Sequence, residues 1–157
     1  MSTATTDILT DRYATPDQAP PIMAQPMGSN AKVYAGTIAI TRAGYVVPIA
    51  SSPQSTDIVW GIIDKQTDNT TGSFYGGAQG AVTAPIDRGS FWLAYSGTIT
   101  QANVDATVYT VDDQTVSLTQ GANGAVAGTI LAFDATISKV AVALGARSAG
   151  TIPGSPF

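Results

Sequence analysis

The chain has 157 residues, of which 44% are hydrophobic and only 11% are charged, and it contains neither histidine nor cysteine. This length suits a single domain with its own core, and the two missing residue types exclude disulfides, thiolate chemistry and the commonest general base and zinc ligand. The net charge is −4, the seven basic residues are scattered, and no apolar run approaches the ~18 residues of a membrane span, so we expect neither direct contact with nucleic acid nor membrane insertion.

Residues 1–31 differ in pattern from the rest of the chain. They contain four of the nine prolines and show neither the period of a strand nor that of a helix, which predicts an extended N-terminal arm. No basic segment precedes an apolar one here, so we expect no export signal. A disordered tail is one interpretation of this segment. The other is an arm that lies along a partner and buries its apolar side chains there; these belong to Ile8, Leu9, Tyr13, Ile22, Met23 and Met27.

Residues 32–144 read as a succession of short strands separated by turn residues. Aspartate supplies all eleven acidic residues, and the absence of glutamate beside abundant threonine and valine favours strands and turns over helices. We therefore expect an all-β fold, a small β-barrel or sandwich of about eight to nine short strands. The expected strands cover residues 32–40, 45–50, 58–64, 81–87, 90–96, 107–111, 115–119, 128–135 and 138–144.

Three shorter segments complete the predicted organisation. Residues 100–106 (TQANVDA) predict a single helical turn capped by Thr100. Residues 65–80 form a polar loop rich in glycine, threonine and asparagine, for which a role as an outward-facing receptor-binding surface stays open. Residues 145–157 (GARSAGTIPGSPF) predict an extended C-terminal tail.

Asp112 and Asp113 are the strongest candidates for a chemical site, because they stand side by side between two apolar runs. The carboxylates of glycosidases face each other across a cleft ~5–10 Å wide and come from separate segments, whereas neighbours in one turn generally point apart. Aspartate accepts hydrogen bonds from backbone amides two residues ahead and is common in tight turns. We therefore interpret Asp112, Asp113 and Gln114 as the bend of a hairpin.

Two loop segments are weaker candidates. Asp64, Asp68 and Asn69 lack the spacing and the glutamate of an EF-hand, which leaves only an irregular calcium site open. The glycines of YGGAQG (75–80) are not followed by the Lys-Ser/Thr pair or the helix that a phosphate-binding loop needs, so this segment predicts a flexible loop.

Trp60, Trp92 and Tyr95 are the aromatic residues that could form a sugar-binding platform. Both tryptophans lie inside apolar strands, where an aromatic side chain more often belongs to the core. No GxSxG motif and no histidine is present to support a serine nucleophile. We identify no catalytic residue, no cofactor and no metal ligand, and we expect the chain not to be an enzyme.

Four short motifs follow one another along the chain: VYAG (33–36), RGSF (88–91), TVYTVDDQTV (107–116) and AGTILAFD (127–134). In this order they resemble the head decoration, or capsid cement, proteins of tailed bacteriophages. The resemblance covers about residues 31–144 and does not include the two end segments.

The resemblance implies a β-rich and often trimeric module on the outer surface of the virion capsid, assembled in the host cytoplasm. Such a module binds where major-capsid subunits meet and braces the shell, and its N-terminal extension reaches neighbouring subunits. The charged fraction of 11%, against roughly 25% in ordinary soluble domains, agrees with a module wedged between partners. The alternative function is a carbohydrate-binding or adhesin module on a virion surface, which requires exposed aromatic side chains on one face.

Overall fold

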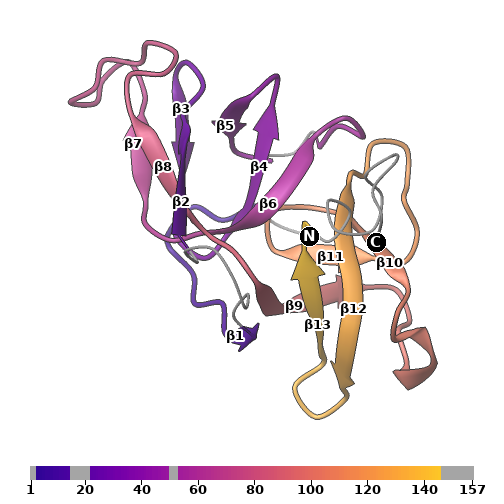
Figure 1. Ribbon diagram of the computed structural model, residues 1–157. Coiled ribbons are helices and arrows are strands. Elements are labelled where there is room, and N and C mark those ends of the chain that lie inside the picture. The colour runs from indigo at the N-terminus through magenta and orange to yellow at the C-terminus, as the bar shows by residue number, and fades with distance from the viewer. Residues whose placement is uncertain (1–2, 15–21, 50–52, 146–157) are drawn as a thin grey trace, which may run out of the picture.

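The computed structural model describes residues 3–14, 22–49 and 53–145. These residues form an all-β structure of two lobes that lie side by side, with strands β2–β8 in the first lobe and β9–β13 in the second (Figure 1). The expected all-β fold is therefore confirmed. Residues 1–2 and 15–21 of the expected arm and 146–157 of the expected C-terminal tail lie outside the described residues.

Most of the strands are short, and the helical turn η1 lies between β9 and β10. Their bounds are β1 Arg12–Ala14, β2 Ile22–Pro26, β3 Ala31–Val33, β4 Ile38–Arg42, β5 Tyr45–Val47, β6 Ile58–Ile63, β7 Thr67–Asn69, β8 Thr83–Asp87, β9 Ser90–Ser96, η1 Gln101–Asn103, β10 Thr107–Thr110, β11 Thr115–Ser117, β12 Val126–Asp134 and β13 Lys139–Leu144.

Strands β9–β13 close into a five-stranded barrel. Their order is β9-β11-β10-β12-β13, and β13 pairs back onto β9. The β9–β11 pairing is parallel, with Thr115 opposite Ala94, and the other pairings in the barrel are antiparallel. Closure leaves no strand edge within the ring, although the first residues of β9 also pair with β1.

The first lobe is an antiparallel sheet that curls almost onto itself. Its order is β2-β8-β6-β4-β5, and a parallel bridge between Met27 and Val46 joins its two outer strands. Strands β3 and β7 form a separate two-stranded sheet of this lobe. Met27 and Val46 are both completely buried, so the bridge lies within a core of its own.

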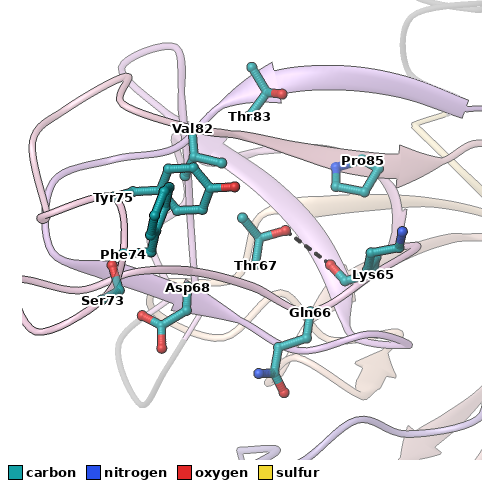
Figure 2. Close-up of a pocket in the computed structure, with 10 residues that line it drawn as sticks. All are labelled: Lys65, Gln66, Thr67, Asp68, Ser73, Phe74, Tyr75, Val82, Thr83 and Pro85. Carbon is teal, nitrogen blue, oxygen red and sulfur yellow. Dashed lines mark hydrogen bonds between the residues drawn. The ribbon is translucent and has the colours of Figure 1, made fainter.

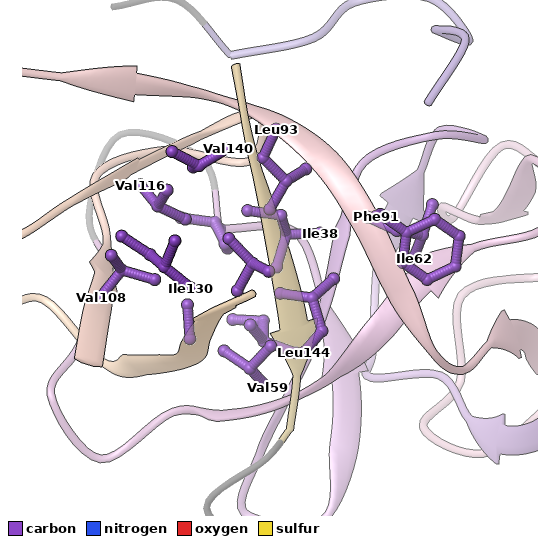
Figure 3. Close-up of a cluster of buried hydrophobic side chains, with 14 of the residues drawn as sticks. Ile38, Val59, Ile62, Phe91, Leu93, Val108, Val116, Ile130, Val140 and Leu144 are labelled. Atoms are coloured by element: carbon purple, nitrogen blue, oxygen red, sulfur yellow. The ribbon is translucent and has the colours of Figure 1, made fainter. Parts of the chain in front are cut away.

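Strands β4 and β6 are buried on both faces because they lie between two hydrophobic cores. Ile40 faces the core shared with the barrel, whereas its neighbour Ala39 faces the first lobe's own core. A β-bulge places Trp60 as an extra residue in β6, so that Val59 and Ile62 both reach the shared core. Figure 3 shows this shared core, which contains Ile38, Ile40, Ile49, Val59, Ile62, Phe91, Leu93, Ile99, Val108, Val116, Ala127, Ile130, Val140, Val142 and Leu144.

The domain begins earlier than the sequence predicts. Residues 22–26, assigned to the arm, form β2 and pair with β8 over five consecutive positions, and Met27 is 0% exposed. β2 escapes the pattern analysis because its side chains alternate between exposed and half-buried and it ends in a proline. The arm prediction is thus corrected at its C-terminal end: Met27 serves this chain's own core and is not available to a partner.

Two further predicted boundaries are refined. The expected strand 32–40 splits into β3 and β4, because the backbone turns at residues 34–37. The expected loop 65–80 contains β7, which pairs with β3. The helical turn after Thr100 is confirmed, with the Asn103 side-chain oxygen accepting the Thr100 N–H at 2.8 Å.

The position of Met27 can be tested by mutation. Because the side chain is fully buried, Met27→Ala should lower the free energy of unfolding by about 2–5 kcal/mol. Leu9→Ala, a change in the same expected arm at a side chain that is 86% exposed, should stay within about 0.5 kcal/mol of the unmodified chain. Urea unfolding of both variants measures the difference, and equal effects would contradict the boundary placed here.

Candidate functional site

Residues 3–14, which we call the N-terminal strap, lie against the turn between β3 and β4. The Ile8 N–H donates to the carbonyl oxygen of Ala35 at 2.7 Å, and the Ala35 N–H donates to the Asp7 carboxylate at 2.8 Å. The Thr10 hydroxyl donates to the Gly36 carbonyl oxygen at 2.6 Å. These three bonds hold the middle of the strap to the first lobe.

Gly36 is required where the strap crosses the turn. Its φ is +86°, and a Cβ atom at this position would lie 2.0 Å from the Ile8 carbonyl oxygen. Any side chain here therefore collides with the strap backbone, in addition to the strain of a left-handed conformation. Gly36 is the last residue of the VYAG motif.

The start of the strap is bound by the acidic pair of the β10–β11 hairpin. The Ala4 N–H lies 3.1 Å from both carboxylate oxygens of Asp113, and both residues are buried. The main-chain carbonyl oxygen of Asp113 accepts the Ile38 N–H at 2.8 Å, at the start of β4. The Asp112 carboxylate accepts the Gln114 N–H at 2.8 Å, the local bond expected of an aspartate in a turn.

The interpretation of Asp112 and Asp113 as a hairpin bend is confirmed, but the bend is buried beneath the strap. Burial is the main cause that raises the pKa of Asp113, and the nearby Asp112 carboxylate raises it further. The hydrogen bond from Ala4 acts in the opposite direction. Asp113 therefore binds a distant segment of the chain, whereas the buried Oδ2 of Asp112 has no hydrogen-bond partner among the residues that the structure describes.

The end of the strap is fastened to β9 through strand β1. The Trp92 N–H donates to the Asp11 carbonyl oxygen at 2.9 Å, and Arg12 pairs with the Asp87 carboxylate. The Arg12 guanidinium also donates to the Arg88 carbonyl oxygen at 2.8 Å. It lies 4.8 Å from the centre of the Phe91 ring, a cation–π contact.

The strap leaves its largest apolar side chains outside. Leu9 is 86% exposed and Tyr13 is 45% exposed, although the Tyr13 ring meets the Trp92 ring edge-on at 5.4 Å. Ile8 and Leu9 line two small cavities, of about 120 and 150 Å³. Of the other expected arm residues, Ile8 and Met23 are partly buried and Ile22 is exposed at the start of β2.

Three of the four sequence motifs contact the strap. VYAG does so through Ala35 and Gly36, RGSF through Arg88 and Phe91, and the hairpin motif through Asp113. The glycine of VYAG, Gly36, is a sequence signal for such a contact, because glycine allows another backbone to approach closely. No local signal marks Asp113 as the anchor of Ala4, because 109 positions separate the two residues in the sequence.

The acidic loop candidates do not gather into a metal site. Asp68 accepts bonds from the Thr70 hydroxyl and N–H, at 2.7 and 2.9 Å, which hold its pKa below the usual range, and it forms a 3.5 Å ion pair with Lys32. Asn69 is buried and binds backbone carbonyl groups. Over the three described ranges, no cluster of three or more acidic side chains is placed to hold a metal ion.

The three aromatic candidates do not form a common platform. Trp60 packs against the first lobe's core, and its ring N–H donates to the Thr41 hydroxyl at 2.8 Å. Tyr95 packs against the shared core beside Phe133, with ring centres 6.1 Å apart. Trp92 lies on the outward face of β9, where Tyr13 of the strap covers it in part.

Comparisons with models of protein families, with characterised proteins and with solved structures found no match for this chain. Within the part of the chain that the structure describes, no helix has the length and apolar character needed to span a membrane.

The Asp113 anchor predicts a specific dependence on pH. The pKa of Asp113 is raised by folding, so this carboxyl contributes most to stability in acid and loses that contribution as the pH rises through its folded pKa. Asp113→Asn keeps an acceptor oxygen but cannot ionise. The unmodified chain loses stability as Asp113 ionises, so the free energy of unfolding of the Asn variant, relative to that of the unmodified chain, should increase from acid to neutral pH. Asp113→Ala leaves the Ala4 N–H unpaired and should cost about 1–3 kcal/mol. Urea unfolding at several pH values measures both, and an Asn variant that parallels the unmodified chain throughout would refute the assignment.

The fit of the strap at Gly36 is tested by a pair of glycine substitutions. Gly36 and Gly44 both occupy turns at positive φ, but apart from the chain neighbours no atom of the described residues lies within 4 Å of a Cβ at Gly44. Both Gly→Ala changes should therefore cost more than about 1 kcal/mol through backbone strain, and only Gly36→Ala should also displace the strap. Amide exchange at Ile8 should accelerate in Gly36→Ala and stay slow in Gly44→Ala. Slow exchange in both variants would show that the strap does not depend on this contact.

Proposed function

We propose that this chain is a structural decoration protein of a bacteriophage head, which binds the outer surface of the capsid and clamps neighbouring major-capsid subunits through its N-terminal strap. The order of the four motifs suggests the family. The observation that carries the proposal is the construction of the strap: its backbone is bonded to this chain's own domain, while Leu9 and Tyr13 stay exposed.

This construction favours binding to another protein. The exposed area of Leu9 and Tyr13 can be buried against a partner, and burying one leucine side chain contributes about 1.5–3 kcal/mol. A flexible arm would lose conformational entropy when it became ordered on a partner, and this loss would offset much of the binding free energy. The strap is already held by its own domain, so little further entropy is lost when it binds. The strap therefore offers a preformed contact surface.

The acidic pair supports a structural function more than a chemical one. Asp113 is occupied by the Ala4 N–H, and the Asp112 side chain bonds within its own turn. A clamp of this kind works through repetition, because closed symmetry multiplies a modest contact over the whole shell. A homotrimer that presents three straps to adjacent capsid subunits fits this mode of action.

Binding to heads tests the function directly. The gene should lie beside one for a major capsid protein, which supplies expanded empty heads for co-sedimentation with the full chain. Leu9→Ser and Tyr13→Ser should each weaken binding about tenfold or more, because each removes apolar area from the contact. Both side chains are exposed, so the variants should remain folded.

The matched control is Ile137→Ser, which removes a side chain that is 49% exposed in the turn between β12 and β13. This variant should bind heads as the unmodified chain does. Heads that fail to bind the unmodified chain would refute the proposed function, whereas equal binding by all variants would refute only the role of the strap.

A further inference from the structure

The loop between β7 and β8 holds two aromatic side chains outside both cores. Phe74 is 96% exposed, the largest exposed fraction among the big apolar side chains of the described residues, and its neighbour Tyr75 is 47% exposed. Their ring centres are 5.2 Å apart and the ring planes are nearly perpendicular, at 88°. This loop lies at the end of the first lobe away from β1 (Figure 1).

Hydrogen bonds fix this loop in shape. The buried Asn69 side chain donates to the carbonyl oxygens of Gly28 and Ala78, at 2.9 and 2.8 Å, and so ties the start of the loop to its end. The Ser73 hydroxyl, next to Phe74, donates to the Thr70 carbonyl oxygen at 2.7 Å. Phe74 therefore lies on an ordered loop, so binding a ligand there costs little further conformational entropy.

An open cavity of about 410 Å³ lies beside the two rings. Figure 2 shows Phe74 and Tyr75 on one side of it, Lys65 and Pro85 on the other, and Thr67 between them in this view. The remaining lining residues are Gln66, Asp68, Ser73, Val82 and Thr83. The volume falls within the ~300–1,000 Å³ that small-molecule sites commonly have.

The lining combines ring surfaces with polar groups that both donate and accept hydrogen bonds. Lys65 is a donor, Asp68 is an acceptor, and the hydroxyl of Thr83 is both. The negative charge of Asp68 is already met by the Thr70 donors and the Lys32 ion pair, so the lining presents mainly hydrogen-bonding groups, with Lys65 as a donor to a hydroxyl group. On β8, addition of a peptide strand is blocked along the edge that pairs with β2 over all five residues, and on the other edge where β6 pairs with Ile86 and Asp87.

A pyranose ring has the complementary chemistry: an apolar C–H face that packs on an aromatic ring and a rim of hydroxyl groups that donate and accept. From this match we infer that the cavity between Phe74, Tyr75 and Lys65 binds a short neutral saccharide, with Phe74 as the stacking surface. The site is separate from the strap, so it adds a glycan-binding surface to the chain whatever the strap binds.

The test uses saturation-transfer NMR on the full chain with three probes: maltotriose, lactose and triacetylchitotriose. At least one probe should show transfer from the protein, and Phe74→Ser should weaken its binding about tenfold or more by removing the stacking surface. The control is Ile137→Ser, an exposed apolar residue in the second lobe, which should leave probe binding unchanged.

Each contrary outcome is distinct. The proposal is wrong if none of the three probes binds at millimolar concentration, or if Phe74→Ser binds a probe as tightly as the unmodified chain. It is also wrong if Phe74→Ser binds every probe as well as the unmodified chain does but co-sediments less with phage heads. The loop would then be a capsid contact. Loss of head binding in the strap variants leaves this test unaffected, so the two proposals can fail separately.

Discussion

One buried aspartate joins the strap, the barrel and the first lobe. Asp113 belongs to the barrel, its side chain accepts the Ala4 N–H of the strap, and its carbonyl oxygen accepts the Ile38 N–H of the first lobe. The strap, the barrel and the start of β4 therefore meet at a single residue. Burying this acid is unfavourable for its ionised form, and the bond from the strap offsets part of that penalty, so the strap and the hairpin stabilise each other.

In the anchored strap, polar groups bond to this chain's own domain and the most exposed large apolar side chain faces outward. Polar groups of Asp7, Ile8 and Thr10 are satisfied within the chain, and Leu9 remains available to a partner. A second surface of different chemistry, around Phe74, lies on the loop between β7 and β8. The decoration function that we propose would use both kinds of surface, one to hold the shell and one to face the surroundings.

Strand β9, expected at residues 90–96, is predicted with its observed bounds. In β9, Phe91 and Leu93 point inward while Ala94 is exposed, which produces a clear alternation. β2 has no such pattern, because neither of its faces is consistently buried. The acidic bend was predicted from local turn chemistry, but its burial depends on a segment far away in the sequence. The sequence does not mark Phe74 and Tyr75 as a surface pair, because exposure, and not residue type, distinguishes them from core aromatics.

Hydroxyl-radical footprinting of the full chain, free and bound to expanded heads, tests the central claim most directly, because it reports the solvent access of individual side chains. The account predicts that the oxidation of Leu9 and Tyr13 falls on binding while Phe74 stays as reactive as in the free chain. Unchanged oxidation of Leu9 and Tyr13 in the bound state, with protection at Phe74 or Ile137 instead, would contradict it.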